Sequence, residues 1–182
     1  MTLKTERLYL LSPDVAGADR VAEYLCRNRE FMEEFEPARE EAYYSVSFQE
    51  EALTRQTKDW EEGRGYRLYI SPKTGAGLII GFVALNNVVM GPFCSCFMGY
   101  QLDKDYLRRG FMTEAVNATV RFAFRELGLH RIEGNIMPRN RASIGVAEKC
   151  GFVNEGTSRK YLKINGVWED HTHFVKINED ME

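Results

Sequence analysis

Long apolar runs and an excess of one charge are both missing from this chain of 182 residues. No stretch approaches the roughly 20 apolar residues that a membrane-spanning helix requires, and the segment from Met1 to Leu8 carries charges where a signal peptide needs an apolar core. The 24 Lys and Arg residues nearly balance the 27 Asp and Glu residues, so the net charge of −3 gives no indication of general nucleic-acid affinity. We therefore expect a cytoplasmic protein that directly contacts neither membranes nor nucleic acids, with no leader to be cleaved.

Metal-site and disulfide patterns are also missing. Four cysteines occur in the chain: Cys26, Cys94, Cys96 and Cys150. They lack the paired spacing of zinc sites, and a cytoplasmic chain keeps its thiols reduced. Cys94 and Cys96 are expected on one face of a strand, and so are His171 and His173, but neither pair has the further ligands that a metal needs. We expect free thiols and no metal site.

The length favours a single domain, residues 1–182, with one full core. Alternating apolar residues predict strands over 3–11, 66–71, 78–89, 94–102 and 131–136, then a hairpin from 152 onward around an Asn165-Gly166 turn. Helical spacing predicts helices over 13–29, 47–62, 112–127 and 141–149. The expected class is mixed α/β, with about seven strands, an antiparallel meander over 66–102, and four main helices.

The segment 107–113 joins a predicted strand to an amphipathic helix through a turn that contains Gly110. A turn of this kind, capped by the positive end of a helix dipole, binds an anion through backbone N–H groups. Gly110 allows the backbone to come close to the anion. Basic residues surround the turn in the sequence: Arg108, Arg109, Arg139, Arg141 and Lys149. We therefore predict a cradle for a diphosphate at this helix start.

Two further segments accompany the cradle, 135–143 and 149–152. Together the three segments resemble the acyl-CoA-binding core of the GNAT acetyltransferases. The usual GNAT motif is Gln or Arg, two residues, Gly, one residue, then Gly or Ala, whereas Leu107 and Met112 stand at the first and last positions here. Because the cradle works through main-chain N–H groups, these departures weaken recognition of the motif more than they weaken binding.

A wider resemblance, to the RimJ-type ribosomal-protein alanine N-acetyltransferases, covers nearly the whole chain. The shared elements include Thr5-Glu-Arg-Leu8, Glu36-Pro-x-Arg39, Gly99-Tyr100, Gly110-x-Met-x-Glu-Ala115, Met137-Pro-x-Asn140, Gly151-Phe152 and Asn165-Gly-x-Trp-x-Asp-His171. The resemblance implies a GNAT fold, whose mostly antiparallel sheet splays between the fourth and fifth strands so that pantetheine fills the gap as a pseudo-strand. Acetyl-CoA is the implied cosubstrate. Its expected contacts are Gln101, Leu102, Leu107, Arg108, Arg109, Gly110, Phe111, Met112, Thr113, Asn140, Ser143 and Lys149.

The resemblance also implies a serine at the leaving group. Many GNAT enzymes protonate the departing thiolate with a tyrosine, but Ala147 stands at that position here. In the related RimL-type enzymes a serine has this task, and its position corresponds to Ser143. We expect Ser143 to support the leaving sulfur while Asn140 hydrogen-bonds the pantetheine. The alternative is that Ser143 merely occupies the first turn of a helix, where serine is common.

The sequence offers several candidates for the general base and does not decide among them. The candidates are Glu36, Asn135, Asp170 and His171, of which His171 has the right intrinsic pKa. A peptide α-amine, with a pKa of about 7.7 to 8.0, is partly neutral near pH 7 and can react through a water relay. Glu36, Asn135 and Tyr100 are expected to contact the acceptor. Six glutamates between Glu30 and Glu41 form either a negative mouth for a cationic acceptor or an ordinary solvated face.

These features predict an N-acetyltransferase that works by direct attack of an amine on the thioester in a ternary complex. The expected acceptor is the N-terminal α-amine of a ribosomal protein that begins with alanine. A polyamine or an amine-bearing antibiotic is the alternative acceptor, and a non-catalytic acyl-CoA-binding or ribosome-assembly module is the alternative function. The sequence leaves open whether the protein is a monomer or a homodimer.

Overall fold

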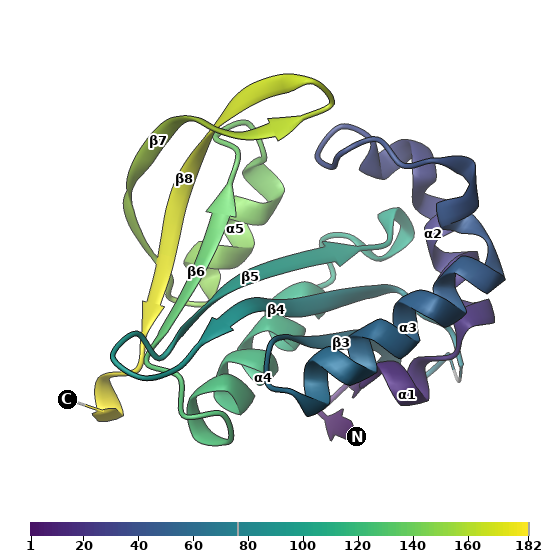
Figure 1. Cartoon of the computed structure of the whole chain (residues 1–182), viewed down its shortest axis with the longest axis horizontal. Helices are drawn as coiled ribbons and strands as arrows, with labels where there is room; N and C mark the ends of the chain where they lie inside the picture. Colours follow the sequence, from purple (N-terminus) through teal and green to yellow (C-terminus); the bar gives the residue numbers. More distant parts are fainter. Residues whose placement is uncertain (76, 182) are drawn as a thin grey trace.

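The computed structural model describes residues 1–75 and 77–181, and its strands form one sheet in the order β1-β2-β3-β4-β5-β6-β8-β7 (Figure 1). The strands are β1 (Thr2–Lys4), β2 (Leu8–Leu11), β3 (Tyr66–Pro72), β4 (Gly81–Val89), β5 (Ser95–Leu102), β6 (Arg131–Ile136), β7 (Val153–Ile164) and β8 (Val167–Ile177). The helices are α1 (Pro13–Ala16), α2 (Ala18–Met32), α3 (Val46–Glu61), α4 (Phe111–Arg125) and α5 (Arg141–Lys149), with 3₁₀ turns η1 (Glu41–Tyr44), η2 (Lys104–Tyr106) and η3 (Glu179–Met181). Only β5 and β6 pair in parallel, so the predicted mixed, mostly antiparallel sheet is confirmed with eight strands in the described residues.

The prediction of one strand over residues 3–11 is wrong, because a turn divides this segment into β1 and β2. The Thr5 side chain closes the turn, because its Oγ1 accepts a hydrogen bond from the Leu8 N–H at 3.0 Å. The two strands pair antiparallel at the edge of the sheet. Apolar residues alternate through the turn as they do along the strands, so the sequence pattern gives no sign of the turn.

The predicted helix over residues 13–29 is also divided, into α1 and α2. Gly17 separates them with a φ of +80°, a conformation outside the helical region that glycine adopts at little cost. The second helix then continues to Met32, past the predicted end. The other predicted helices agree with α3, α4 and α5 to within two residues at each end.

The expected pairing of Cys94 and Cys96 on one strand face is wrong. Cys94 lies in the turn before β5 with a φ of +41°, and its Sγ donates to the Gly91 carbonyl at 2.9 Å. Cys96 is buried within β5. All four cysteines are free thiols, as expected. No helix in the described residues is both long enough and apolar enough to span a bilayer.

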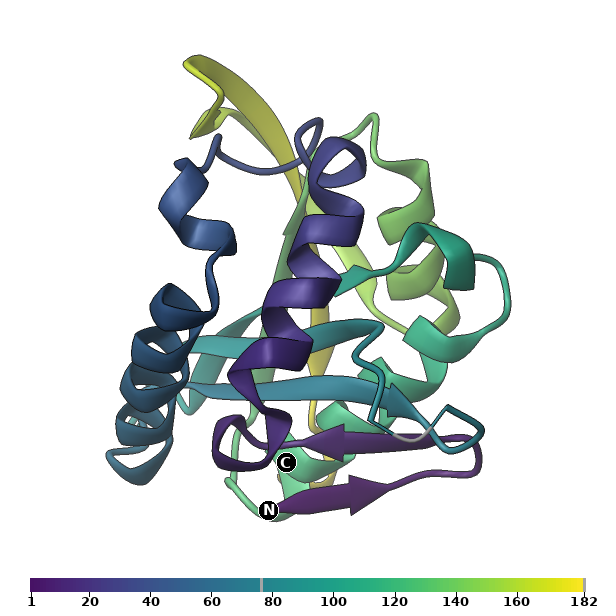
Figure 2. The same cartoon turned by 90° about the vertical axis from the view of Figure 1, so that its right-hand side faces the viewer.

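The two faces of the sheet carry separate cores. Along β4, Val83 and Leu85 join the larger cluster that packs against α4 and α5, whereas Phe82 and Ala84 join a second cluster with residues of α1, α2 and α3. This is the alternation expected of a strand that is covered on both sides. Figure 2 shows α1 to α3 grouped apart from α4 and α5. The fold therefore offers two distinct approaches to the middle of the sheet.

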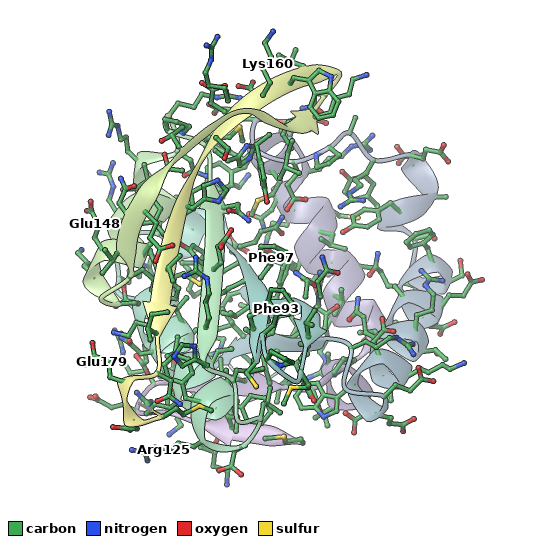
Figure 3. All side chains as sticks on the ribbon, turned by 60° about the vertical axis from the view of Figure 1, so that its left-hand side comes forward. Phe93, Phe97, Arg125, Glu148, Lys160 and Glu179 are labelled. Carbon is green, nitrogen blue, oxygen red and sulfur yellow. The ribbon has the colours of Figure 1, made fainter. Side chains whose placement is uncertain are left out.

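The predicted splay is confirmed between β5 and β6. Their pairing covers only Ser95–Phe97 opposite Arg131–Glu133. Beyond that point β5 stays with β4, and β6 stays with β8. Phe97, labelled in Figure 3, is the last residue of β5 that pairs with β6. The edges of β5 and β6 that face each other beyond Phe97 are available to an extended ligand.

Candidate functional site

The predicted cradle has the expected backbone geometry. Gly110 precedes α4 in the left-handed conformation, with φ +78° and ψ 1°, and Arg108 has a φ of +60°. The Glu114 N–H makes the first helical hydrogen bond of α4, to the Gly110 carbonyl at 3.0 Å. The N–H groups before it, including those of Phe111 and Met112, have no acceptor within the helix by its geometry. They lie at the positive end of the helix dipole, where an anionic group is stabilised.

A hydrogen-bonded anchor from the β1–β2 turn fixes this cradle. The Glu114 carboxylate accepts from the Thr5 hydroxyl at 2.6 Å, from the Arg7 N–H at 2.8 Å and from the Arg7 Nε at 2.7 Å. Burial alone would raise the pKa of Glu114, but these hydrogen bonds outweigh it and lower the pKa. The Arg7 Nη1 also donates to the Arg109 carbonyl at 2.9 Å, inside the cradle segment.

Sequence reasoning quoted Thr5, Arg7 and Glu114 as parts of the resemblance but gave them no role. The structure shows that they hold the first turn of α4 and the Arg109 carbonyl, both parts of the predicted cradle. The Arg7 guanidinium also lies over the Phe111 ring, 4.6 Å from its centroid. Because Arg7 balances the charge of Glu114, the carboxylate in the first turn of α4 does not cancel the positive field of the cradle.

The predicted basic residues have different surroundings. Arg108 and Arg109 are exposed at the cradle, and Arg109 lies over the Tyr106 ring at 5.3 Å. Lys149 is exposed at the end of α5, next to Cys150, whose Sγ contacts the Thr113 carbonyl at 3.7 Å. Arg139 is engaged elsewhere. It forms an ion pair with Glu169 of β8 at 2.8 Å.

Ser143 lies in the first turn of α5 and is held from two sides. Its N–H donates to the Asn140 Oδ1 at 3.1 Å, so Asn140 is the N-cap of the helix. Its carbonyl accepts from the Tyr100 hydroxyl at 2.7 Å. Burial raises the pKa of Tyr100, which keeps this phenol protonated. Tyr100 packs with the α4–α5 core, and its predicted contact with the acceptor stays a prediction.

The strand on the other side of the gap is β6, which pairs with β8. The side chains described next lie on the sheet face toward α2 and α3. Asn135 and Glu133 of β6 both contact His173, whose Nδ1 lies 2.6 Å from the Asn135 Oδ1 and 3.0 Å from the Glu133 Oε1. The His173 Nε2 lies 2.7 Å from the Ser158 Oγ. Sequence reasoning had not identified this network, which links β6, β7 and β8 and has no local signal in the chain.

The remaining base candidates differ in their surroundings. His171 is 3% exposed, and its Nδ1 lies 3.1 Å from the Glu169 carbonyl. The Tyr161 ring lies against His171, with ring centroids 5.8 Å apart. Asp170 is exposed, and its Oδ1 accepts from the Lys160 N–H at 2.8 Å, where β7 departs from regular pairing. The structure thus gives Asp170 a role in strand geometry.

Glu36 lies between α2 and η1, beside a cavity of about 240 Å³. Burial raises the pKa of Glu36, and the nearby Arg39 and Arg67 partly oppose that shift. Arginines and tyrosines line the cavity together with apolar and glutamine side chains, and the Tyr24 hydroxyl at its wall lies 3.3 Å from the Gln101 Oε1 on β5. The wall of this cavity is therefore basic, unlike the negative mouth that the glutamate-rich segment suggested.

The tip of the β7–β8 hairpin closes over the same side of the molecule. The Asn165 Oδ1 accepts from the Ala38 N–H at 2.6 Å, and its Nδ2 donates to the Glu33 carbonyl at 2.7 Å. Figure 1 shows the hairpin tip next to the segment after α2. The predicted Asn-Gly turn therefore has a second role, which is to bridge two distant parts of the chain.

Neither buried thiol is suited to act as a nucleophile at neutral pH. Burial raises the pKa of Cys96 to about 12 and that of Cys150 to about 11, so both remain protonated. Within the described residues, no group of three or more His, Cys, Asp or Glu side chains is arranged to hold a metal ion.

Comparisons with known proteins agree with this geometry. A model of the family described as "Acetyltransferase (GNAT) domain" matches residues 7–153. The chain is 41% identical over 180 residues to a probable N-acetyltransferase, YjcK, from Bacillus subtilis, and the match covers 99% of each chain. The crystal structure of a ribosomal-protein-S5-alanine acetyltransferase from Vibrio fischeri has a TM-score of 0.91 and 33% identity, covering 100% of this chain and 99% of that one.

Mycobacterium smegmatis RimJ, solved in complex with CoA-disulfide, has the same fold, with a TM-score of 0.84 and 24% identity over 94% of this chain and 87% of its own. The splayed sheet, the left-handed glycine before α4 and the extent of the family match lead to one assignment. The chain belongs to the GNAT acetyltransferase family and is an N-acetyltransferase of the kind related to RimJ and RimL.

Proposed function

We propose that this enzyme transfers the acetyl group of acetyl-CoA to the N-terminal α-amine of a ribosomal protein that begins with alanine. The observation that carries the proposal is the position of the cradle, which follows β5 and η2 at the end of the strand that has left β6. An extended thioester bound at the cradle can continue along this gap. The similarity to an S5-alanine acetyltransferase over the whole chain supports the choice of acceptor.

In this proposal the cofactor is held mainly by the main chain. The N–H groups around Gly110 receive the diphosphate, with Arg108, Arg109 and Lys149 adding positive charge. The pantetheine pairs with the free edge of β5 near Gln101 and Leu102 and receives a hydrogen bond from the Asn140 amide. Further predicted contacts come from the cradle side chains: Leu107, Phe111, Met112 and Thr113.

The proposed reaction is a direct transfer. The neutral amine attacks the thioester carbonyl carbon, the C–S bond breaks, and the Ser143 hydroxyl donates a hydrogen bond to the departing thiolate, which takes up the proton that the nitrogen releases. The nitrogen loses its proton to His171 or to water. Protonated Cys96 and Cys150 support this order, because neither offers a thiolate for an acyl-enzyme.

The acceptor enters from the face of α2 and α3, with Glu36 and Asn135 nearest the amine and Tyr100 supporting from the opposite face. His171 is the proposed base, ahead of Glu36, Asn135 and Asp170. If His171→Ala leaves the pH dependence of kcat unchanged, His171 is not the base.

Because the proposed substrates are ribosomal proteins and acetyl-CoA, we place the enzyme in the cytoplasm.

Thiol release in the presence of acetyl-CoA tests the proposal. The acceptors are an Ala-initiated peptide, the same peptide with a blocked N-terminus and an internal lysine, spermidine, and an aminoglycoside. We expect turnover with the free α-amine only. Turnover with spermidine or the aminoglycoside alone would show a small-amine enzyme, and no thiol release despite calorimetric binding of CoA would show a binding module.

A further inference from the structure

The arginine-lined cavity between α2, α3 and the sheet has a role that acetyl transfer itself does not require. Three arginines line it: Arg39 from the segment after α2, Arg55 from α3 and Arg67 from β3. Glu36 contributes one negative charge nearby. The cavity wall is therefore positive, although the chain as a whole has a net charge of −3.

All three guanidinium groups lie over aromatic rings, and Arg55 also pairs with Glu51 at 3.7 Å. The Arg67 guanidinium lies 4.1 Å from the Phe82 ring centroid, and that of Arg39 lies 4.8 Å from the Tyr43 centroid. Within residues 1–75 and 77–181, neither has a carboxylate oxygen within 4.0 Å. Stacking fixes the plane of a guanidinium and leaves its N–H edges able to donate.

The arginines that serve only the fold look different. Arg27 contacts the fully buried Asp103 carboxylate at 2.7 Å, and Arg131 pairs with Glu133 and Glu155. Their charges are neutralised within the protein. Arg39 and Arg67 instead face a cavity without a carboxylate in ion-pair contact among the described residues, although Arg67 also hydrogen-bonds the Tyr69 side chain and both lie in the field of Glu36. A guanidinium in this position can donate to an incoming carboxylate.

The cavity is connected to the cofactor gap. Tyr24 and Phe82 belong to its wall. The Tyr24 hydroxyl lies 3.3 Å from the Gln101 side chain, and Phe82 is the β4 partner of Gln101 in the ladder. Since an extended peptide advances about 3.3 Å per residue, a group a few residues behind a reacting amine can reach the cavity.

We propose that this cavity binds the carboxylate of an acidic residue that lies within the first few positions of the peptide acceptor. The inference rests on the proposed function, because it assumes that a peptide N-terminus is the substrate. Arg39 and Arg67 donate to the carboxylate, and Arg55, which also lies 3.7 Å from Glu51, adds to the field. The cavity thereby selects among alanine-initiated chains.

The test uses isosteric peptides that begin with alanine and carry either Asp or Asn at one position from the second to the sixth. Initial rates give kcat and KM for each pair with the full-length enzyme. For one position we expect a KM about tenfold lower with Asp than with Asn, as for a charge-assisted hydrogen bond. The value of kcat should be similar for both peptides.

Arg67→Met and Arg39→Met should each reduce this preference while leaving the KM of the Asn peptide nearly unchanged. The matched control is Arg64→Met, because Arg64 is exposed outside the cavity and pairs with Asp59 at 2.6 Å. This control should keep the full preference. Thermal unfolding of each variant confirms that it is folded, and Arg39, which is exposed, provides the variant least able to disturb the core.

The outcomes separate the two claims. Equal KM values for Asp and Asn peptides at every position would overturn the carboxylate site while leaving the N-terminal acetyltransferase intact. A preference that survives in Arg39→Met and Arg67→Met would also overturn it. If no alanine-initiated peptide is acetylated at all, both the site and the proposed acceptor fall.

Discussion

The proposed cofactor side and the proposed acceptor side of this enzyme are built by different means. The cradle consists of main-chain groups from one short segment, 107–113, and is steadied by the single remote turn of Thr5 and Arg7. The proposed acceptor side consists of side chains from α2, α3, β3 and the β7–β8 hairpin. A site made of N–H groups tolerates changes of side chain, whereas a site made of side chains changes its specificity with each substitution.

The comparison explains the unusual residues of the cradle. Leu107 and Met112 depart from the usual GNAT motif, yet Gly110 still holds the left-handed conformation and α4 still begins after it. The backbone thus keeps its geometry without the usual side chains. The acceptor side has no such protection, and we expect relatives to differ there first.

The largest expected effect is at Ser143, where the two sides meet. Ser143→Ala should lower kcat about 100-fold, the usual scale for losing a positioned proton donor. The affinity for CoA, measured by calorimetry, should stay unchanged because the Asn140 cap and the Tyr100 contact involve only the backbone of residue 143. An unchanged kcat would show that Ser143 has only a structural role in the first turn of α5.

Gly110→Ala should weaken CoA binding at least about tenfold, since the added Cβ disfavours the left-handed backbone and misaligns the N–H donors. That Cβ would also lie 3.3 Å from the Arg7 Nη2. Gly128→Ala is the matched control, with a φ of +65° at the opposite end of α4. Both variants should lose similar stability. Equal loss of CoA affinity in the two would contradict a specific cradle.

Glu114→Gln should lower the free energy of unfolding by about 1 to 3 kcal/mol at neutral pH, because Arg7 loses its charged partner. The lowered pKa of Glu114 means that its contribution is complete above its ordinary pKa of 4.5 and is lost as the pH falls through the lower folded value. Denaturant unfolding from pH 7 to pH 3 should therefore be less pH-dependent in the variant. Parallel pH profiles would show that the anchor carries no net stability.

The smallest effect is expected at the hairpin tip. Asn165→Gly keeps the positive φ of the turn but removes both hydrogen bonds to the segment after α2. Peptide KM should rise about threefold, the net value of roughly one hydrogen bond, while CoA affinity stays the same. Asn165→Asp, which keeps the acceptor for the Ala38 N–H, should fall between. A change in CoA affinity instead would contradict the proposal that the cofactor side and the acceptor side are independent.

Local chemistry made much of the fold predictable. The strand over 131–136 and the helix over 141–149 agree with β6 and α5 at both ends, and the Asn-Gly turn lies where expected. The cradle could be predicted for the same reason, since its glycine, turn and helix are consecutive. The division of residues 3–11 was missed because the turn depends on Thr5 bonding to Leu8, which leaves the alternation intact.

The acceptor side could not be predicted in the same way. Asn165 and Ala38 are 127 positions apart, and Tyr24 and Gln101 are 77 apart. Such contacts depend on how the elements pack and leave no spacing in the sequence. For this reason the sequence did not decide whether the six glutamates form an acceptor mouth or a solvated face. In the structure Glu33 and Glu41 engage Arg29, and arginines line the cavity.

Because β5 and β6 separate, the sheet has an opening that joins its two faces. If the thioester lies on one side and the protein substrate approaches from the other, only a narrow flexible terminus has to enter, and the bulk of a folded ribosomal subunit component can remain outside. The two products would then depart in opposite directions. The release of one product would then not depend on the release of the other.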